Sequence, residues 1–253
     1  MKLWALGDPH LSFGNPKPMD VFGDLWRDHP ARIAGAWDRL VGPDDVVLVL
    51  GDVSWGRNLS EAAPDLAFLA ERPGRLKVLL RGNHDSWWSS RKKVEAALPG
   101  GLVLLQNDAL RLPEGVVVCG ARGWNLPSMP WADPEKDPPI LRRELGRLEL
   151  SLAEAERLRK PGDVLVAALH YPPLGPGDES SEVLERLAAA GVDLAAYGHL
   201  HGEDHAWAPR GVHRGVDLRF CAVDFTGFAP VALFEAGKGI LPDEGPREAR
   251  RGG

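Results

Sequence analysis

Five short apolar runs predict the main β-strands of this chain. Residues 45–50 and 164–169 consist almost entirely of Val, Leu and Ala, a pattern typical of strands that are covered on both faces. We expect three similar strands at residues 2–7, 75–80 and 192–197. Each of the five runs leads into a segment that contains Asp, Asn or His.

Apolar residues at helical spacing predict helices between these strands. The expected helices span residues 28–40, 60–71, 138–159 and 181–190, and Asp28, Ser60 and Ser181 are their expected N-caps. Alternation of strands and helices favours an α/β fold with parallel βαβ units. In such folds ligand sites lie at the carboxyl ends of the strands.

The expected helix over residues 138–159 carries a stripe of leucines on one face. Core packing is the interpretation we adopt, because the stripe is short. A dimer seam is the alternative, so the sequence leaves the oligomeric state open.

The rest of the chain predicts shorter elements. Short strands are expected at residues 101–105, 109–112 and 115–120, and residues 204–234 predict further strands that complete a second sheet. We expect residues 1–241 to form a single domain and residues 242–253, which are charged and rich in Gly and Pro, to form a flexible tail.

Composition narrows the class of protein. The 253 residues are 44% hydrophobic and 26% charged, and the net charge is −6 without any block of Lys or Arg. This gives no electrostatic support to nucleic acid as a partner. Cys119 and Cys221 stand alone, which indicates a reducing cytoplasm. No apolar run is long enough to cross a bilayer, and the first strand leads so directly into Asp8 that we expect neither a leader nor a membrane partner.

Side chains that can bind metals follow all five strands. They are Asp8 and His10, then Asp52, then Asn83 with His84 and Asp85, then His170, and finally His199 and His201. In an extended chain residues i and i+2 point to the same side, so we expect Asp8 with His10, and His199 with His201, to converge. A set of carboxylate, amide and imidazole ligands suits Mn²⁺, Fe or Zn²⁺ better than Ca²⁺.

The ordered motifs Asp8-x-His10, Gly51-Asp52, Gly82-Asn83-His84-Asp85, His170 and Gly198-His199-x-His201 resemble those of the calcineurin-like metallophosphoesterase superfamily. The likeness covers residues 5–201 and is nearest to a bacterial branch of predicted phosphohydrolases. It implies a four-layer α/β/β/α sandwich of two mixed sheets flanked by helices, with a dinuclear metal site. Pro9 departs from the usual Leu or Ile and stiffens the first turn.

The resemblance also implies a role for each motif residue. One metal would be held by Asp8, His10 and His201, the other by Asn83, His170 and His199, and Asp52 would bridge them. The two ions would be divalent or transition metals, with Mn²⁺ expected first and Fe or Zn²⁺ as alternatives. His84 would assist at the phosphoryl or leaving oxygen and Asp85 would orient His84, although Asp85 has a helix N-cap as its alternative reading.

The implied activity is hydrolysis of a phosphate ester, with a metal-bridging hydroxide as nucleophile. A small-molecule ester is the expected substrate, while the choice between phosphatase and phosphodiesterase stays open, as do the substrate-binding residues. The alternatives are a non-catalytic binding module on the same fold and a nuclease.

For several residues near the motifs, the sequence leaves two interpretations of their role open. Arg122 could meet a phosphate or be a solvated charge, and Trp55, Trp87, Trp88 and Trp124 could shape a pocket or fill the core. We expect His29 at a helix N-terminus and His205 and His213 in hairpins.

Overall fold

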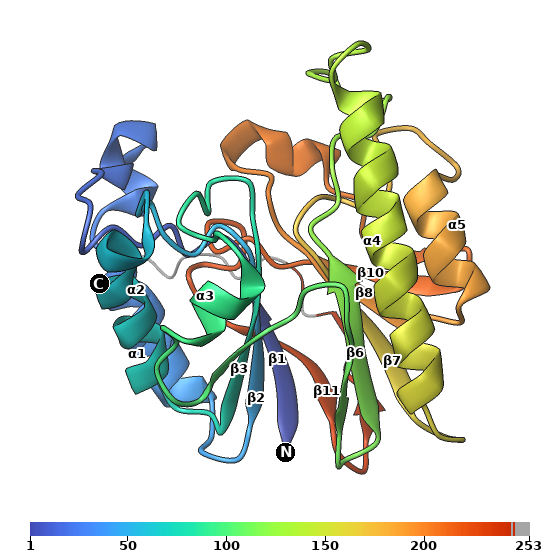
Figure 1. The fold of residues 1–253 in the computed structure, drawn as a ribbon, viewed down its shortest axis with the longest axis horizontal. Coiled ribbons are helices and arrows are strands. Elements are labelled where there is room, and N and C mark those ends of the chain that lie inside the picture. Colours follow the sequence, from blue (N-terminus) through green and yellow to red (C-terminus); the bar gives the residue numbers. More distant parts are fainter. Residues whose placement is uncertain (244, 246–253) are drawn as a thin grey trace.

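The computed structural model describes residues 1–243 and 245 of the chain. Two six-stranded sheets stack face to face, and helices cover the outer side of each sheet (Figure 1). This is the four-layer α/β/β/α sandwich predicted from the sequence. The predicted tail, residues 242–253, falls largely outside the described residues.

The first sheet has four parallel strands and an antiparallel pair at one edge. Its strand order is β12 (Gly239–Ile240), β11 (Val231–Glu235), β1 (Lys2–Leu6), β2 (Val46–Leu50), β3 (Leu76–Leu80) and β4 (Leu102–Leu104). The helices α1 (His29–Leu40), α2 (Leu59–Glu71) and α3 (Arg91–Glu95) lie on its outer side (Figure 1).

The second sheet also has four parallel strands in its middle, with an antiparallel strand at each edge. Its order is β5 (Leu110–Leu112), β6 (Val116–Ala121), β7 (Val164–Leu169), β8 (Leu194–Tyr197), β10 (Val216–Phe220) and β9 (Gly211–His213). The long helix α4 (Asp137–Leu158) and α5 (Glu182–Ala189) cover it (Figure 1).

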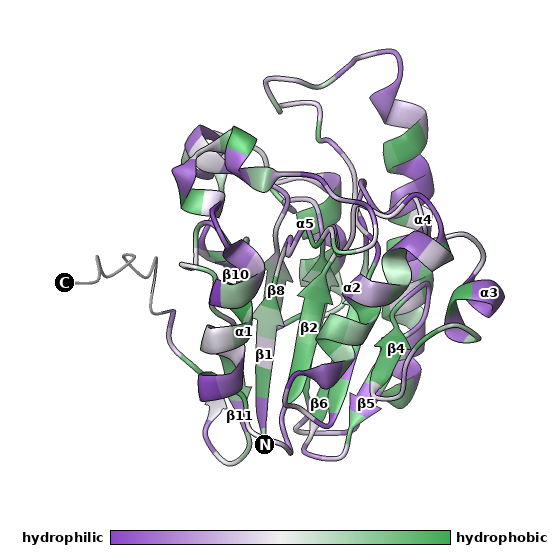
Figure 2. Ribbon diagram, turned by 90° about the vertical axis from the view of Figure 1, so that its left-hand side faces the viewer, coloured by the Kyte–Doolittle hydropathy of each residue, from purple (hydrophilic) through white to green (hydrophobic). Residues whose placement is uncertain are grey.

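Alternate residues of each central strand face different layers, which explains the continuous apolar runs. In β2, Val46, Leu48 and Leu50 belong to the core between the two sheets, whereas Val47 and Val49 belong to the core beneath α1 and α2. Both faces are therefore apolar. Figure 2 shows central strands such as β2 in the hydrophobic colour, whereas helices and loops also carry hydrophilic residues.

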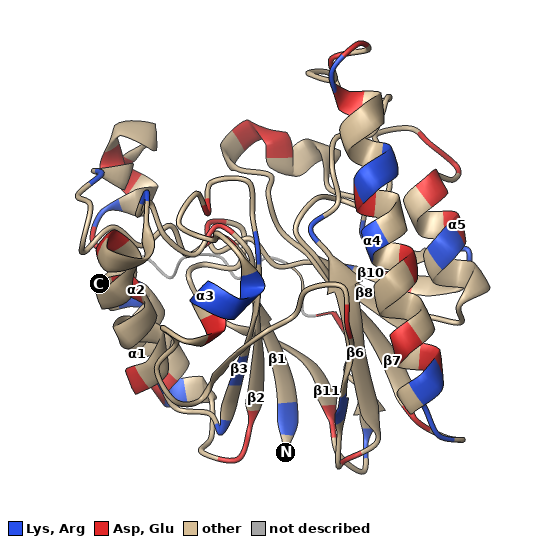
Figure 3. Cartoon of the chain, in the orientation of Figure 1, with Lys and Arg blue, Asp and Glu red and all other residues tan. Residues whose placement is uncertain are grey.

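Leucines of α4 pack onto the second sheet. Leu141, Leu145, Leu148 and Leu152 are buried in one core with β6 and β7 residues. The stripe is therefore core packing, as predicted, and charged residues of both signs occupy the rest of the helix (Figure 3). Despite its length α4 is too polar to span a membrane, and none of the helices in residues 1–243 is long and apolar enough to do so.

Two helix starts differ from prediction. The α2 cap is Asn58, whose side-chain oxygen accepts a hydrogen bond from the Glu61 amide, so Ser60 lies inside the helix. Asp28 precedes α1 in a left-handed conformation and its side chain makes no capping bond. The predicted Ser181 cap is confirmed, since Oγ accepts from the Leu184 amide.

The expectation for residues 204–234 was wrong in part. β9 and β10 do join the second sheet, but β11 pairs antiparallel with β1 of the first. His205 lies in a 3₁₀ helix, η3 (Gly202–Trp207), and not in a hairpin. Two further 3₁₀ helices, η1 (Met19–Phe22) and η2 (Asp24–Trp26), interrupt the segment between β1 and α1.

Candidate metal centre

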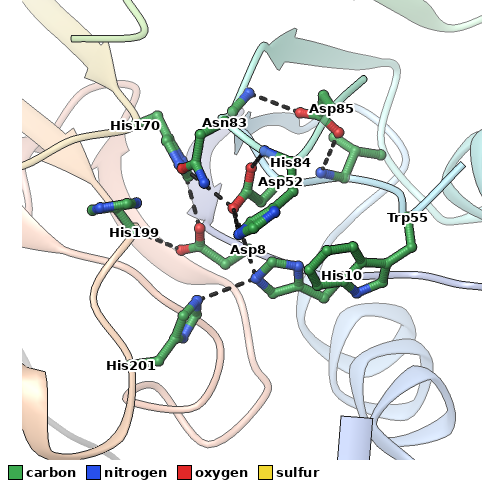
Figure 4. A network of polar contacts seen from close by, with 12 residues as sticks. Asp8, His10, Asp52, Trp55, Asn83, His84, Asp85, His170, His199 and His201 are labelled. Atoms are coloured by element: carbon green, nitrogen blue, oxygen red, sulfur yellow. Dashed lines mark hydrogen bonds and ion pairs between the residues drawn. The ribbon is translucent and has the colours of Figure 1, made fainter. Parts of the chain in front are cut away.

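The residues predicted to bind metals come together where the parallel strands of both sheets end. Asp8 and His10 follow β1, Asp52 follows β2, Asn83 and His84 follow β3, His170 follows β7, and His199 and His201 follow β8. Figure 4 shows these side chains pointing into one volume between the two sheet edges. Because parallel strands share a direction, their loops meet at one edge.

Asp52 lies at the middle of this volume. Its Oδ2 is 3.6 Å from His170 Nε2, 3.8 Å from His10 Nε2 and 4.0 Å from His84 Nε2. Its Oδ1 accepts a hydrogen bond of 2.8 Å from the His84 amide. One oxygen is therefore fixed by the backbone, and the other faces imidazoles that come from three loops (Figure 4).

Asp8, His10 and His201 form one group of potential metal ligands. One ligand atom from each lies within 4.8 Å of the others. His10 Nε2 is only 3.2 Å from His201 Nε2. Asp8 Oδ2 accepts from the His199 amide, but its Oδ1 is buried and has no hydrogen-bond partner among the described residues. Buried polar atoms are normally satisfied, so the surroundings of Asp8 Oδ1 fit a bound cation.

Asp8, Asp52 and His170 form a second group with the same spacing. His170 Nδ1 lies 2.9 Å from the Leu50 carbonyl oxygen, to which it must donate. In a neutral imidazole the other nitrogen, Nε2, then carries a lone pair. That nitrogen faces the Asn83 side-chain oxygen at 2.7 Å. The His170 lone pair and the Asn83 oxygen are thus two acceptors that face each other, and a cation bound by both would satisfy them.

Burial keeps the imidazoles of His10 and His170 in the neutral form that binds metals. It lowers the pKa of His170 to about 3 and the pKa of His10 well below its ordinary value. Burial also raises the pKa of Asp8, against the opposing attraction of His201. A buried carboxylate that is costly to ionise gains most from a cation at its free oxygen. The donor set therefore fits one or two transition metal ions.

The backbone at the site is held in an uncommon conformation. Asp8, His10, Asp52 and His199 all have positive φ values, of 59°, 45°, 49° and 77°. Side-chain-bearing residues rarely adopt this left-handed region, and such strain clusters at functional sites. The convergence of Asp8 with His10 therefore arises from a tight loop, and the expectation of an extended chain with both side chains on one side was wrong.

Gly82 and Gly198 are needed because carboxylates occupy the space beside them. A Cβ at Gly82 would lie 2.0 Å from Asp52 Oδ1, and a Cβ at Gly198 would lie 2.1 Å from Asp8 Oδ2. Neither glycine has a positive φ. Close approach, and not an unusual turn, is therefore the reason for glycine at both positions.

His199 is less closely grouped than the other predicted ligands. Its ring packs against Tyr171, with 3.9 Å between centroids, and lies 5.0 Å from the His170 ring. It belongs to neither of the two groups formed by described residues. Its predicted role as a ligand stays a prediction.

Asp85 does not contact the His84 ring, so the expected orientation of His84 by Asp85 was wrong in its geometry. Asp85 is fully buried, and its carboxylate accepts from the amides of Gly82, Val53 and Ser54 and from the Trp87 indole. Asp85 thus links two segments, the turn that contains Asn83 and the loop after β2. The alternative reading as a helix cap also fails, because no helix follows directly.

The His84 side chain is 45% exposed and stands beside Trp55, with 4.5 Å between ring centroids. Partial burial lowers the pKa of His84, although Asp52 acts in the opposite direction. The ring therefore lies at the solvent-exposed side of the site, with Trp55 packed against it.

Asp224 and His205 were missed by sequence reasoning. Asp224 Oδ1 lies 2.9 Å from His201 Nδ1, and its Oδ2 lies 3.0 Å from His205 Nε2. Hydrogen bonding to Asp224 and the attraction of acidic neighbours outweigh burial and raise the pKa of His201 to about 9. The available signal was an acidic residue shortly after β10, a strand the sequence did not separate from its neighbours.

Some of the residues for which the sequence left two interpretations contact residues of the metal centre, and others lie in the hydrophobic core. His29 starts α1 as expected, and its Nε2 contacts the His10 carbonyl oxygen at 3.2 Å. Trp87 and Trp88 are buried in the core between the first sheet and the helices that cover it. Trp55 contacts His10 and His84. Arg122 donates to the buried Glu144 at 2.8 Å and is therefore not a solvated charge.

Comparison with known proteins agrees with this geometry. The family model of the calcineurin-like phosphoesterases matches residues 1–203. The chain is 38% identical over 84 residues to the gene 66 protein of Mycobacterium phage L5, across 32% of this chain and 39% of that protein. It is 37% identical over 83 residues to the gene 66 protein of phage D29, across 33% and 40%. The chain thus spans about two fifths of the length of these curated relatives.

Solved structures resemble the fold at low sequence identity. A protein of unknown function from Aquifex aeolicus is 16% identical, with coverage of 91% of this chain and 95% of that chain and a TM-score of 0.47. Protein TT1561 of Thermus thermophilus is also 16% identical, with coverage of 84% and 89% and a TM-score of 0.48.

Proposed function

This chain belongs to the calcineurin-like phosphoesterase family, and we propose that it is a metallophosphoesterase that hydrolyses small-molecule phosphate mono- or diesters at a dinuclear centre. Its Asp/His groups, which can hold metal, support this proposal. The observation that carries the proposal is the place of Asp52, whose free oxygen faces imidazoles from three loops. A reducing cytoplasm is the compartment we propose, in keeping with two buried free cysteines.

Seven side chains would hold the two ions. Asp8, His10 and His201 would bind one ion, Asn83, His170 and His199 the other, and Asp52 would bind both. Mn²⁺ is the ion we propose first, and the mixed donors also suit Fe or Zn²⁺. A metal pair of this kind supplies charge stabilisation to a phosphoryl group and lowers the pKa of a bound water.

His84 is the residue we propose for direct contact with substrate. It is exposed at the mouth, its amide donates to Asp52, and its Nε2 points back toward Asp52 Oδ2. From this position Nε2 can donate a hydrogen bond to a phosphoryl oxygen or give a proton to the leaving oxygen. Trp55 packs on His84 and His10 and limits the directions their rings can take.

A non-catalytic binding module is the second candidate. It would be favoured by the loss of a metal-binding residue, yet all seven side chains are present and six of them belong to, or directly contact, the two ligand groups. A nuclease is the third candidate, and the net charge of −6 gives it no support.

The test is hydrolysis of p-nitrophenyl phosphate and bis-p-nitrophenyl phosphate, after chelation and again after Mn²⁺ is added. We expect the chelated protein to be inactive and the metal to restore hydrolysis of at least one ester. The ester that is hydrolysed faster would show whether the protein acts as a phosphatase or as a phosphodiesterase. Lack of hydrolysis with Mn²⁺, Fe²⁺ and Zn²⁺ would count against the proposal and in favour of the binding module.

A further inference from the structure

The segment between β1 and α1 forms one wall of a pocket beside the metal centre. The pocket has a volume of about 420 Å³, within the range of small-molecule sites. On one side it is lined by His10, His84 and His201 of the centre. On the other side it is lined by residues of η1 and η2 together with Lys17 and Trp55.

Aromatic rings dominate the far wall. Trp55 is already engaged, because it contacts His10 and His84 and the Lys17 ammonium lies 3.1 Å from its ring centroid. Trp26 is almost completely buried. Phe22 is different, since 62% of the residue is exposed. The Lys17 ammonium lies 5.8 Å from the Phe22 ring centroid, much farther than from Trp55, so Phe22 offers the most accessible aromatic face to a ligand.

The ionisable side chains of the pocket are the three histidines of the centre and Lys17. Among the described residues, its lining includes no Asp, Glu, Asn, Gln, Ser or Thr. Lys17 brings an ammonium that lies over aromatic rings, and within the described part of the chain it forms no ion pair with a carboxylate. Hydroxyl groups of a sugar would find few acceptors here, and burial without partners is costly. A flat ring with acceptor atoms on its edge would find a stacking face and a donor.

We propose that this pocket binds an aromatic group of nucleobase size that is joined to the reacting phosphate through the alcohol part of the ester. Phe22 would stack on the ring, and Lys17 would donate to acceptor atoms at its edge. The proposal rests on the proposed function, because it takes the phosphate to lie at the metal centre. It narrows the substrate class to nucleotides and similar aryl-bearing esters, and it disfavours simple sugar phosphates.

Adenosine 5′-monophosphate and ribose 5-phosphate provide a matched pair, since they differ only at C1′, which carries adenine in one and a hydroxyl group in the other. Each would be tested as a competitor of chromogenic ester hydrolysis by the Mn²⁺-loaded protein. We expect the nucleotide to inhibit at a concentration lower by about ten-fold or more, because stacking of one base contributes roughly a 5- to 150-fold preference. Phe22→Ala should bring the two inhibition constants close together.

Val21→Ala is the matched control. Val21 lies in the same 3₁₀ helix, is 69% exposed and does not line the pocket, so this variant should keep the wild-type preference. Lys17→Met should reduce the preference while leaving ribose 5-phosphate inhibition nearly unchanged. Equal inhibition by the two compounds in the wild-type protein would overturn the proposal, and so would an unchanged preference in Phe22→Ala.

A second readout separates this proposal from the proposed function. Calorimetric titration with adenosine and with ribose needs no turnover, and we expect heat of binding for adenosine alone, lost in Phe22→Ala. Adenosine binding without ester hydrolysis under any metal would reject the proposed function and keep the pocket. Ester hydrolysis without adenosine binding would reject the pocket and keep the proposed function.

Discussion

Asp224 Oδ1 lies 2.9 Å from His201 Nδ1 and fixes which nitrogen of His201 faces the metal centre. In the neutral form of His201 that binds a metal, the proton stays on Nδ1, toward the carboxylate, and Nε2 carries the lone pair on the side of His10. Asp224 also accepts from the Gly202 amide, and its side chain is only 1% exposed. A buried carboxylate of this kind orients a metal-binding histidine and makes it more basic.

Asp224→Asn should therefore weaken metal binding without removing a ligand. We expect a loss of affinity of about 10- to 100-fold, the usual cost of removing such a supporting carboxylate. The measurement is competition for Mn²⁺ with a chelating dye. Asp204→Asn makes the same charge change at an exposed position of η3 and should leave the affinity unchanged. Wild-type affinity in Asp224→Asn would show that His201 needs no partner.

His84→Ala and Asp52→Asn should separate turnover from metal binding. His84 belongs to neither ligand group, so His84→Ala should retain its metal and lose most turnover, by about 100-fold or more. Asp52→Asn should lose the metal itself, because the carboxylate that we propose to bind both ions loses its charge. Metal content by mass spectrometry and ester hydrolysis measure the two effects. Equal loss of metal in both variants would reject this division of roles.

Gly198→Ala should damage the centre through a single methyl group. The added Cβ would lie 2.1 Å from Asp8 Oδ2, so the carboxylate must move. We expect bound metal to fall and the free energy of unfolding to drop by about 1–3 kcal/mol.

Gly146→Ala is the control for this substitution. Gly146 lies inside α4 and a Cβ there would meet no atom within 4 Å. This variant should keep its metal and gain about 0.5–1 kcal/mol of stability. Normal metal content in Gly198→Ala would mean that Asp8 is not held as described.

Asp45→Ala should lower the free energy of unfolding, although Asp45 lies far from the metal centre. Asp45 accepts from the amides of Lys2 and Gly42 and from the Trp4 indole, and so joins β1 to the start of β2. Three donors lose their acceptor, and we expect a loss of about 2–4 kcal/mol at pH 7, measured by urea unfolding. Asp44→Ala, at an exposed neighbouring position, should have little effect.

The effect of Asp45 should also depend on pH. Burial acts to raise its pKa, but the donors from Lys2, Gly42 and Trp4 outweigh burial and lower it from its ordinary value. Its contribution is therefore complete above the unfolded-state pKa of about 3.9 and is lost as the pH falls through the lower folded-state value. The difference between wild type and Asp45→Ala should shrink below about pH 4. A difference that stays constant from neutral pH down to about pH 3 would contradict this account.

The sandwich could be predicted because each layer leaves a local pattern. Runs such as residues 164–169 are apolar on both faces since both faces are covered, and β7 has the predicted bounds, Val164–Leu169. The β11 strand was assigned to the wrong sheet for a physical reason. Its pairing with β1 joins residues far apart in the chain, such as Lys2 and Glu235, and neither strand carries a mark of its partner.

The gathering of polar residues at one edge could also be predicted, because parallel strands dictate where their ends meet. The hydrogen bonds that hold these polar residues in place could not be predicted from the sequence. Asp85 is the sequence neighbour of His84, yet its partners include Val53 and Ser54 of another loop. Asp224 is an acidic residue shortly after a strand, but nothing in the neighbouring sequence indicates that it will contact His201. Long-range hydrogen bonds of this kind depend on the finished fold.

The most direct test of the dinuclear centre is anomalous scattering from crystals of the protein grown with Mn²⁺. We expect two peaks per chain, one beside Asp8, His10 and His201 and one beside Asn83 and His170, with Asp52 between them. A single peak, or peaks away from Asp52, would contradict it.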